Sequence, residues 1–137
     1  MSVAPEVLEI LCLWVRKAEH DFEAIRRIMA VEAECPYDVV CFHCQQAAEK
    51  YLKCLLTLVG VQAPRTHDLS ELLRLLPEAL RPQVDSDDLS KLNPYAIDAR
   101  YYDLRDLQRD DAIQALAVAE AVRADARRHL PPEALPS

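Results

Sequence analysis

The chain has 137 residues, of which 51% are hydrophobic and 6% aromatic, with one glycine. This composition excludes a β-rich fold, which needs glycine turns and strands of β-branched or aromatic residues. Ala, Leu, Glu and Arg dominate instead, so we expect an all-α fold. The net charge of −7 excludes broad, sequence-independent binding to nucleic acid, which needs a strongly basic surface.

Apolar residues at three- and four-residue steps predict a first helix from Pro5 to about Ala33, which Pro36 stops. A second helix is expected from about Tyr37 to Val59, with Gly60 as its C-terminal cap. The third element, residues 68–80, begins with a capping pair of Asp and Glu and bends or ends at its proline.

A polar loop leads to a short helical segment over residues 88–93, with Ser86 or Asp87 as its cap. Residues 94–106 are irregular and rich in tyrosine and charge. The last helix, residues 109–130, starts acidic and ends basic, as the helix dipole favours, and residues 131–137 form a frayed tail. These elements predict an antiparallel up-and-down helical bundle of four to five helices in a single domain, residues 1–130.

No apolar stretch approaches the length of a membrane span, so we expect no membrane partner. Five cysteines without a disulfide-scaffold spacing predict a reduced, cytoplasmic protein. On the second helix Cys41, Cys44 and Cys54 lie in or beside the apolar face, where free cysteine acts as a small hydrophobe. A zinc or redox site is the alternative, but no second Cys-x-x-Cys pair completes a ligand set, so no metal site is predicted.

A second, polar face of the same helix carries His43, Gln46, Lys50 and Lys53. Gln45 and Glu49 lie next to it, and Glu49 is spaced for an i,i+4 ion pair with Lys53. This face is either a solvated surface or a binding site.

Three segments in this order resemble the HEPN domain found in prokaryotes and higher eukaryotes. They are "FHCQQAAEK" from Phe42, "THDL" from Thr66 and "ARYYD" from Ala99. The resemblance covers nearly the whole chain from Trp14. It implies a helical bundle that usually dimerises, is proposed to bind nucleotides, and is often the toxin half of a toxin–antitoxin pair with a minimal nucleotidyltransferase.

Many HEPN domains are metal-independent ribonucleases with an arginine followed by a histidine at the dimer cleft. Arg123 and His129 fit that spacing here, with His129 as the base and Arg123 stabilising the phosphate. On an unbroken helix these two side chains lie about 120° apart, so a helix break or a dimer partner must bring them together. Alternatively, they belong to a basic helix C-terminus favoured by the dipole.

Other polar residues of these motifs also have two interpretations. His67 either has a structural role, as a cap of the third helix or a hydrogen-bonding residue of its turn, or belongs to a site. Arg100 forms either a buried ion pair or a phosphate contact, and Tyr101 either packs or stacks on a nucleotide.

The expected function is a homodimeric binding module that holds a nucleotide or RNA phosphate or pairs with a nucleotidyltransferase subunit. No cofactor is predicted. A ribonuclease and a purely structural dimerisation domain are the alternatives. The expected nucleotide-binding residues are His43, Gln46, Lys50, Lys53, Arg100 and Tyr101.

Overall fold

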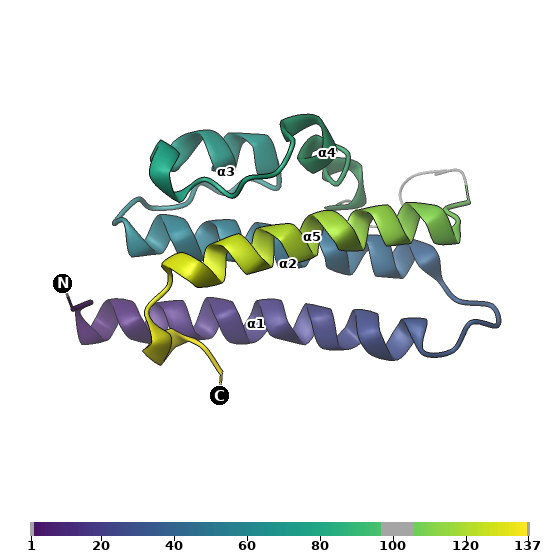
Figure 1. Cartoon of the computed structure of the whole chain (residues 1–137), viewed down its shortest axis with the longest axis horizontal. Helices are drawn as coiled ribbons and strands as arrows, with labels where there is room; N and C mark the ends of the chain where they lie inside the picture. Colours follow the sequence, from purple (N-terminus) through teal and green to yellow (C-terminus); the bar gives the residue numbers. More distant parts are fainter. Residues whose placement is uncertain (1, 97–105, 137) are drawn as a thin grey trace.

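A computed structural model describes residues 2–96 and 106–136 of the chain. Within these residues the regular structure consists of five α-helices and three short 3-10 helices, without a strand. The α-helices are α1 (Pro5–Met29), α2 (Tyr37–Leu58), α3 (Leu69–Leu75), α4 (Ser86–Ser90) and α5 (Arg109–His129); the 3-10 helices are η1 (Glu78–Leu80), η2 (Asn93–Ala96) and η4 (Pro132–Ala134). The prediction of an all-α bundle is therefore confirmed (Figure 1).

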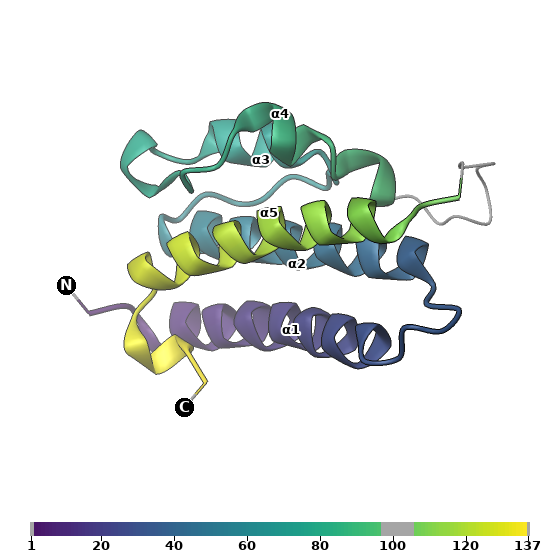
Figure 2. The same cartoon turned by 45° about the vertical axis from the view of Figure 1, so that its right-hand side comes forward.

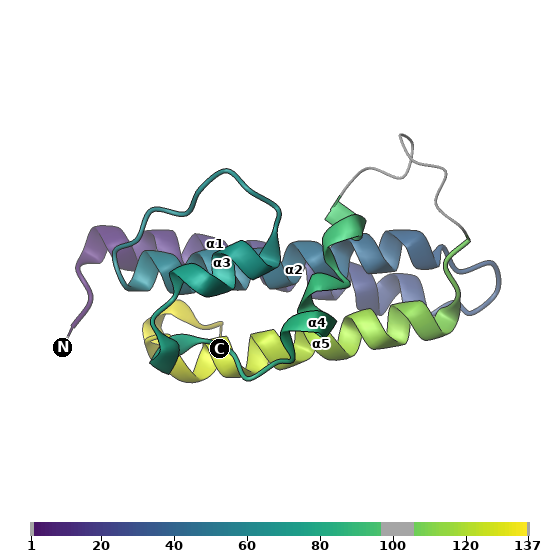
Figure 3. The same cartoon turned by 90° about the horizontal axis from the view of Figure 1, so that it is seen from above.

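The central element of the bundle is α2, which packs against α1 on one side and α5 on another. The short helices α3 and α4 form a further layer, on the side of α2 away from α1 (Figure 2). As predicted, α1 and α2 are antiparallel. The alternation does not continue to α5, which runs in the same direction as α2, because the α3–α4 segment carries the chain back along the bundle first (Figure 3).

The boundaries of the first two helices follow from local backbone chemistry. Pro5 occupies the first turn of α1, where its missing N–H costs nothing. The helix ends at Met29, earlier than its apolar pattern predicted, and the connection to α2 includes Glu34 at a φ of 54°. After α2, Gly60 has a φ of 75°, a left-handed conformation that glycine adopts without strain, so its predicted capping role is confirmed.

The core is built mainly from the apolar face of α2. Its three cysteines are fully buried there, beside large apolar neighbours from α1, α3 and α5 such as Leu11, Leu72 and Val122. Burial raises the pKa of the Cys41 thiol to about 11 and that of Cys54 to about 12. The thiols are therefore protonated packing groups at neutral pH, as predicted.

Besides the end of α1, two boundaries differ from the predictions. Asp85, rather than Ser86 or Asp87, caps α4, because its carboxylate accepts from the backbone N–H groups of residues 87 and 88. The tail does not fray over its described residues: Pro132–Ala134 form η4, which packs against α1 and buries Ala134. The apolar side chains of "PPEALPS" make these contacts. The short length of the tail and its prolines had given no indication of them.

Candidate functional site

The polar face of α2 is organised around two buried carboxylates. The first is Asp21 on α1, whose side chain is 8% exposed. Its Oδ1 accepts from His43 Nδ1 at 2.7 Å and its Oδ2 from Lys50 Nζ at 2.6 Å. Two basic groups of α2 are therefore held on opposite oxygens of one carboxylate, which ties α2 to α1.

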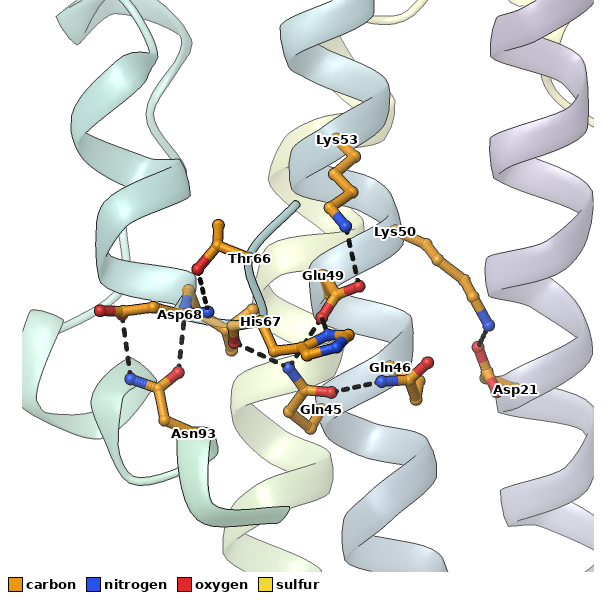
Figure 4. Close-up of polar contacts among 11 residues, drawn as sticks. Asp21, Gln45, Gln46, Glu49, Lys50, Lys53, Thr66, His67, Asp68 and Asn93 are labelled. Carbon is orange, nitrogen blue, oxygen red and sulfur yellow. Dashed lines mark hydrogen bonds and ion pairs between the residues drawn. The ribbon is translucent and has the colours of Figure 1, made fainter. Parts of the chain in front are cut away.

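The second carboxylate is Glu49 of α2 (Figure 4). Its Oε1 accepts from His67 Nδ1 at 2.8 Å and from Gln45 Nε2 at 3.2 Å. Its Oε2 accepts from Lys53 Nζ at 3.1 Å, so the predicted i,i+4 ion pair is confirmed. Like the first cluster, this one joins one carboxylate to one histidine and one lysine.

Burial alone would raise the pKa of Glu49, but the hydrogen bonds from His67, Gln45 and Lys53 outweigh it. The pKa of this carboxyl is therefore lowered, and Glu49 stays ionised at neutral pH. An ionised, buried acid is stable only while its donors remain in place, so the three contacts hold one another in position.

A loop before α3 delivers His67 to this cluster. Gln45 Nε2 also donates to the backbone carbonyl of His67 at 3.1 Å, which anchors the loop on α2. Asp68 then caps α3 through the N–H groups of residues 70 and 71, as predicted, and its carboxylate accepts from Asn93 Nδ2. His67 does not cap the helix; it contacts α2 instead, and its side chain is 67% exposed.

The structure brings the predicted site residues of α2 to one face but divides them between two carboxylates. His43 and Lys50 share Asp21, whereas Lys53 bonds Glu49. Gln46 links to the second cluster, because its Nε2 donates to Gln45 Oε1 at 2.7 Å. Two further predicted residues, Arg100 and Tyr101, lie outside the described residues.

Asp21 is the residue of this candidate site that the sequence did not reveal. It lies on the buried side of α1 between Ala18 and Ile25, but the neighbouring Phe22 continues the apolar spacing and so concealed it. A charged residue at a core-facing position needs a partner of opposite charge, which the sequence of α1 alone does not identify.

The proposed catalytic pair lies on α5, away from this face. Arg123 makes a bidentate ion pair with Glu19 of α1, at 2.7 Å from Nε and 2.9 Å from Nη2. The Tyr51 hydroxyl also donates to Glu19 and accepts from Arg127 at 3.3 Å. His129 is exposed and is the last residue of the helix, which is unbroken between the two positions.

Burial would raise the pKa of Glu19, but Arg123 and Tyr51, with Arg127, lower it overall. The cluster therefore fixes Arg123 as a clamp between α1 and α5. Since α5 is continuous, Arg123 and His129 do not converge within one chain, and only a partner chain could complete that pair.

Among the described residues, no group of three or more His, Cys, Asp and Glu side chains is arranged to hold a metal ion. Within residues 2–96 and 106–136, no helix is long and apolar enough to cross a membrane.

Comparison with known proteins places this helical arrangement in a family. The model of the HEPN domain matches residues 12–129. ST0689, described as an archaeal HEPN homologue, is 25% identical, with a TM-score of 0.67 over 86% of this chain and 95% of its own. TT1696 from Thermus thermophilus is 28% identical, with a TM-score of 0.66 over 85% of this chain and 95% of its own. No curated protein matches the sequence. The match over most of the chain confirms the resemblance, and the protein belongs to the HEPN domain family.

Proposed function

We propose that this HEPN domain is a binding module that holds the phosphate of a nucleotide or RNA on the polar face of α2. The observation that carries the proposal is the balance of groups on that face. Four basic side chains surround two carboxylates, and each lysine ammonium has three N–H donors, of which one is used by a described carboxylate. N–H donors of both lysines therefore remain unused by the residues that the structure describes.

The charge balance also limits the strength of such binding. The two lysines cancel the charge of the two carboxylates, and the whole chain carries −7. Hydrogen-bond geometry, rather than net positive charge, has to supply the affinity. We expect weak dependence on salt, in contrast to proteins that bind nucleic acid through many phosphate contacts.

In the cell, we propose, the domain pairs with itself and with a minimal nucleotidyltransferase subunit in the reducing cytoplasm, as in a toxin–antitoxin pair. The acidic surface suits a basic protein partner better than free RNA. The five free cysteines agree with a reducing compartment.

Nucleotide titration of purified protein, followed by calorimetry, tests the proposal. Lys50→Gln removes the donor that faces Asp21 and should weaken nucleotide binding about tenfold, the effect of losing one charge-assisted hydrogen bond. Lys91→Gln is the matched control, because Lys91 also pairs with an acid but its side chain, at the C-cap of α4, is 70% exposed. A flat titration of the wild-type protein, or equal loss in both variants, would contradict phosphate binding at this face.

The same preparation separates the two alternatives. Cleavage of RNA in the presence of EDTA that disappears in His129→Ala would establish the ribonuclease and require a dimer to complete the pair. A protein that neither binds nucleotides nor cleaves RNA would be a structural dimerisation domain.

A further inference from the structure

The hydrogen bonds on the polar face of α2 have a fixed direction, because their end points are carboxylates that can only accept. Asp21 Oδ1 accepts from His43 Nδ1, so that nitrogen carries the proton. In the neutral imidazole the other ring nitrogen, Nε2, is then an acceptor, and it has no hydrogen-bond partner within the described part of the chain. The buried carboxylate thus determines which ring nitrogen of His43 is left to accept a hydrogen bond from a ligand.

The same reasoning orients the two adjacent glutamines. Gln45 directs one atom at both Glu49 Oε1 and the carbonyl oxygen of His67, which are acceptors, so this atom is the amide nitrogen. Its Oε1 therefore accepts, and Gln46 must donate to it through Nε2. The Oε1 atom of Gln46 is left as a second acceptor, without a partner among the residues that the structure describes.

His43, Gln46 and Lys50 follow one another at three- and four-residue steps, so they occupy one stripe of α2. Along this stripe the helix offers an acceptor nitrogen, an acceptor oxygen and an ammonium group with unused N–H donors. A phosphate alone does not match this pattern, since it would place its acceptor oxygens against two further acceptors. A matching ligand carries hydrogen-bond donors next to an anionic group.

We propose that His43 and Gln46 accept hydrogen bonds from the ribose hydroxyl groups of a ribonucleotide whose phosphate is held by Lys50. This inference rests on the proposed phosphate binding and adds the ribose as the part of the ligand that the site recognises. His43 and Gln46 are specificity-determining residues, and Asp21 and Glu49 are positioning residues that act through them. A 2′-deoxyribose leaves an acceptor unpaired when the complex forms, so the site discriminates between ribose and deoxyribose.

Free nucleotides and RNA share this ribose-phosphate chemistry, so both are tested. The affinity of the protein is measured by calorimetry for the four ribonucleoside triphosphates and their 2′-deoxy counterparts, and for a short oligoribonucleotide and its DNA equivalent. We expect the deoxy form to bind at least about tenfold more weakly, with the same ratio for all bases. Tighter binding of the oligoribonucleotide than of any free nucleotide would assign RNA as the source.

The decisive variant is His43→Asn. Its amide nitrogen occupies the position of Nδ1 and can still donate to Asp21, whereas nothing replaces Nε2. We expect this variant to fold, to retain phosphate binding and to lose discrimination between ribose and deoxyribose. Gln46→Leu is a second variant, which removes the outer acceptor and should reduce the discrimination. His20→Asn, at an exposed position on α1, is the control and should keep it.

The outcomes separate this inference from the proposed function. Equal binding of ribose and deoxyribose ligands, discrimination that depends on the base alone, or unchanged discrimination in His43→Asn would overturn the inference and leave phosphate binding intact. Failure of every nucleotide and oligonucleotide to bind would overturn both.

Discussion

The buried carboxylate of Glu49 makes the sharpest stability prediction. Glu49→Gln preserves the shape of the side chain but replaces an acceptor-only group with one oxygen and one N–H donor. Three donors, from His67, Gln45 and Lys53, now meet a group that can satisfy fewer of them. Lys53, whose side chain is 13% exposed, also loses its counter-charge.

Breaking a buried ion pair costs about 3–5 kcal/mol, and the lower end applies because His67 reaches solvent and can rehydrate. We expect Glu49→Gln to lower the free energy of unfolding by about 3 kcal/mol, which lowers Tm by about 10 °C in a domain of this size. Urea and thermal unfolding at pH 7, followed by circular dichroism, measure both quantities.

The pH dependence gives a second readout. The pKa of Glu49 is lowered from its ordinary value of 4.5 in the folded state, so its contribution is complete above that value. It is lost as the pH falls through the lower, folded-state pKa. The gap in stability between wild type and Glu49→Gln should therefore be constant from pH 7 to about pH 5 and narrow below it.

Glu23→Gln is the control for this experiment, because Glu23 also has a lowered pKa but bonds two arginines at the surface. Surface ion pairs are screened by water, so this variant should keep the wild-type Tm. Equal Tm values for Glu49→Gln and Glu23→Gln, or a gap that does not narrow as the pH falls below 4.5, would refute the network described for Glu49.

Three further predictions concern the core and one turn. Tyr51→Phe should lower stability by about 1–2 kcal/mol, because Glu19 and Arg127 both lose the hydroxyl; denaturant unfolding measures it. At pH 8, Ellman's reagent should react with the two partly exposed cysteines of the folded protein and reach Cys41, Cys44 and Cys54 only on unfolding; a third fast thiol would contradict their burial. Gly60→Ala should cost about 1 kcal/mol, all of it from backbone strain at its φ of 75°, because no described atom outside the adjacent residues lies within 4 Å of the added methyl group; an unchanged Tm would show that the turn relaxes.

The long helices could be predicted from the sequence because their signals are local. Apolar periodicity located α1 and the core face of α2, Pro36 marked the stop after α1, and Gly60 marked the end of α2. The acidic start and basic end of residues 109–130 indicated α5. The thiols of α2 were placed in the core by the same periodicity. Such patterns depend only on the helical repeat, and tertiary packing reinforced them here.

The partners of the polar residues could not be predicted in this way. The spacing within α2 identified a polar stripe and the pair of Glu49 with Lys53, which are four residues apart. It did not reveal that His43 and Lys50 bond Asp21, because these residues lie far from Asp21 in the sequence. His43 is 22 positions away from it and Lys50 is 29 positions away. The clamp of Arg123 on Glu19 spans 104 positions and was equally invisible to a local pattern.

The packing of η4 on α1 has a practical consequence for where the domain is cut. The family match stops at residue 129, yet Leu130 and Ala134 are buried, and the Cys12 thiol donates to the carbonyl of Glu133 at 3.5 Å. An expression fragment truncated at the family boundary would lose the apolar side chains that cover the first helix and would expose an aggregation-prone apolar patch. Affinity tags and fusion partners are therefore best attached beyond Pro136, with a spacer, so that these last side chains can still dock.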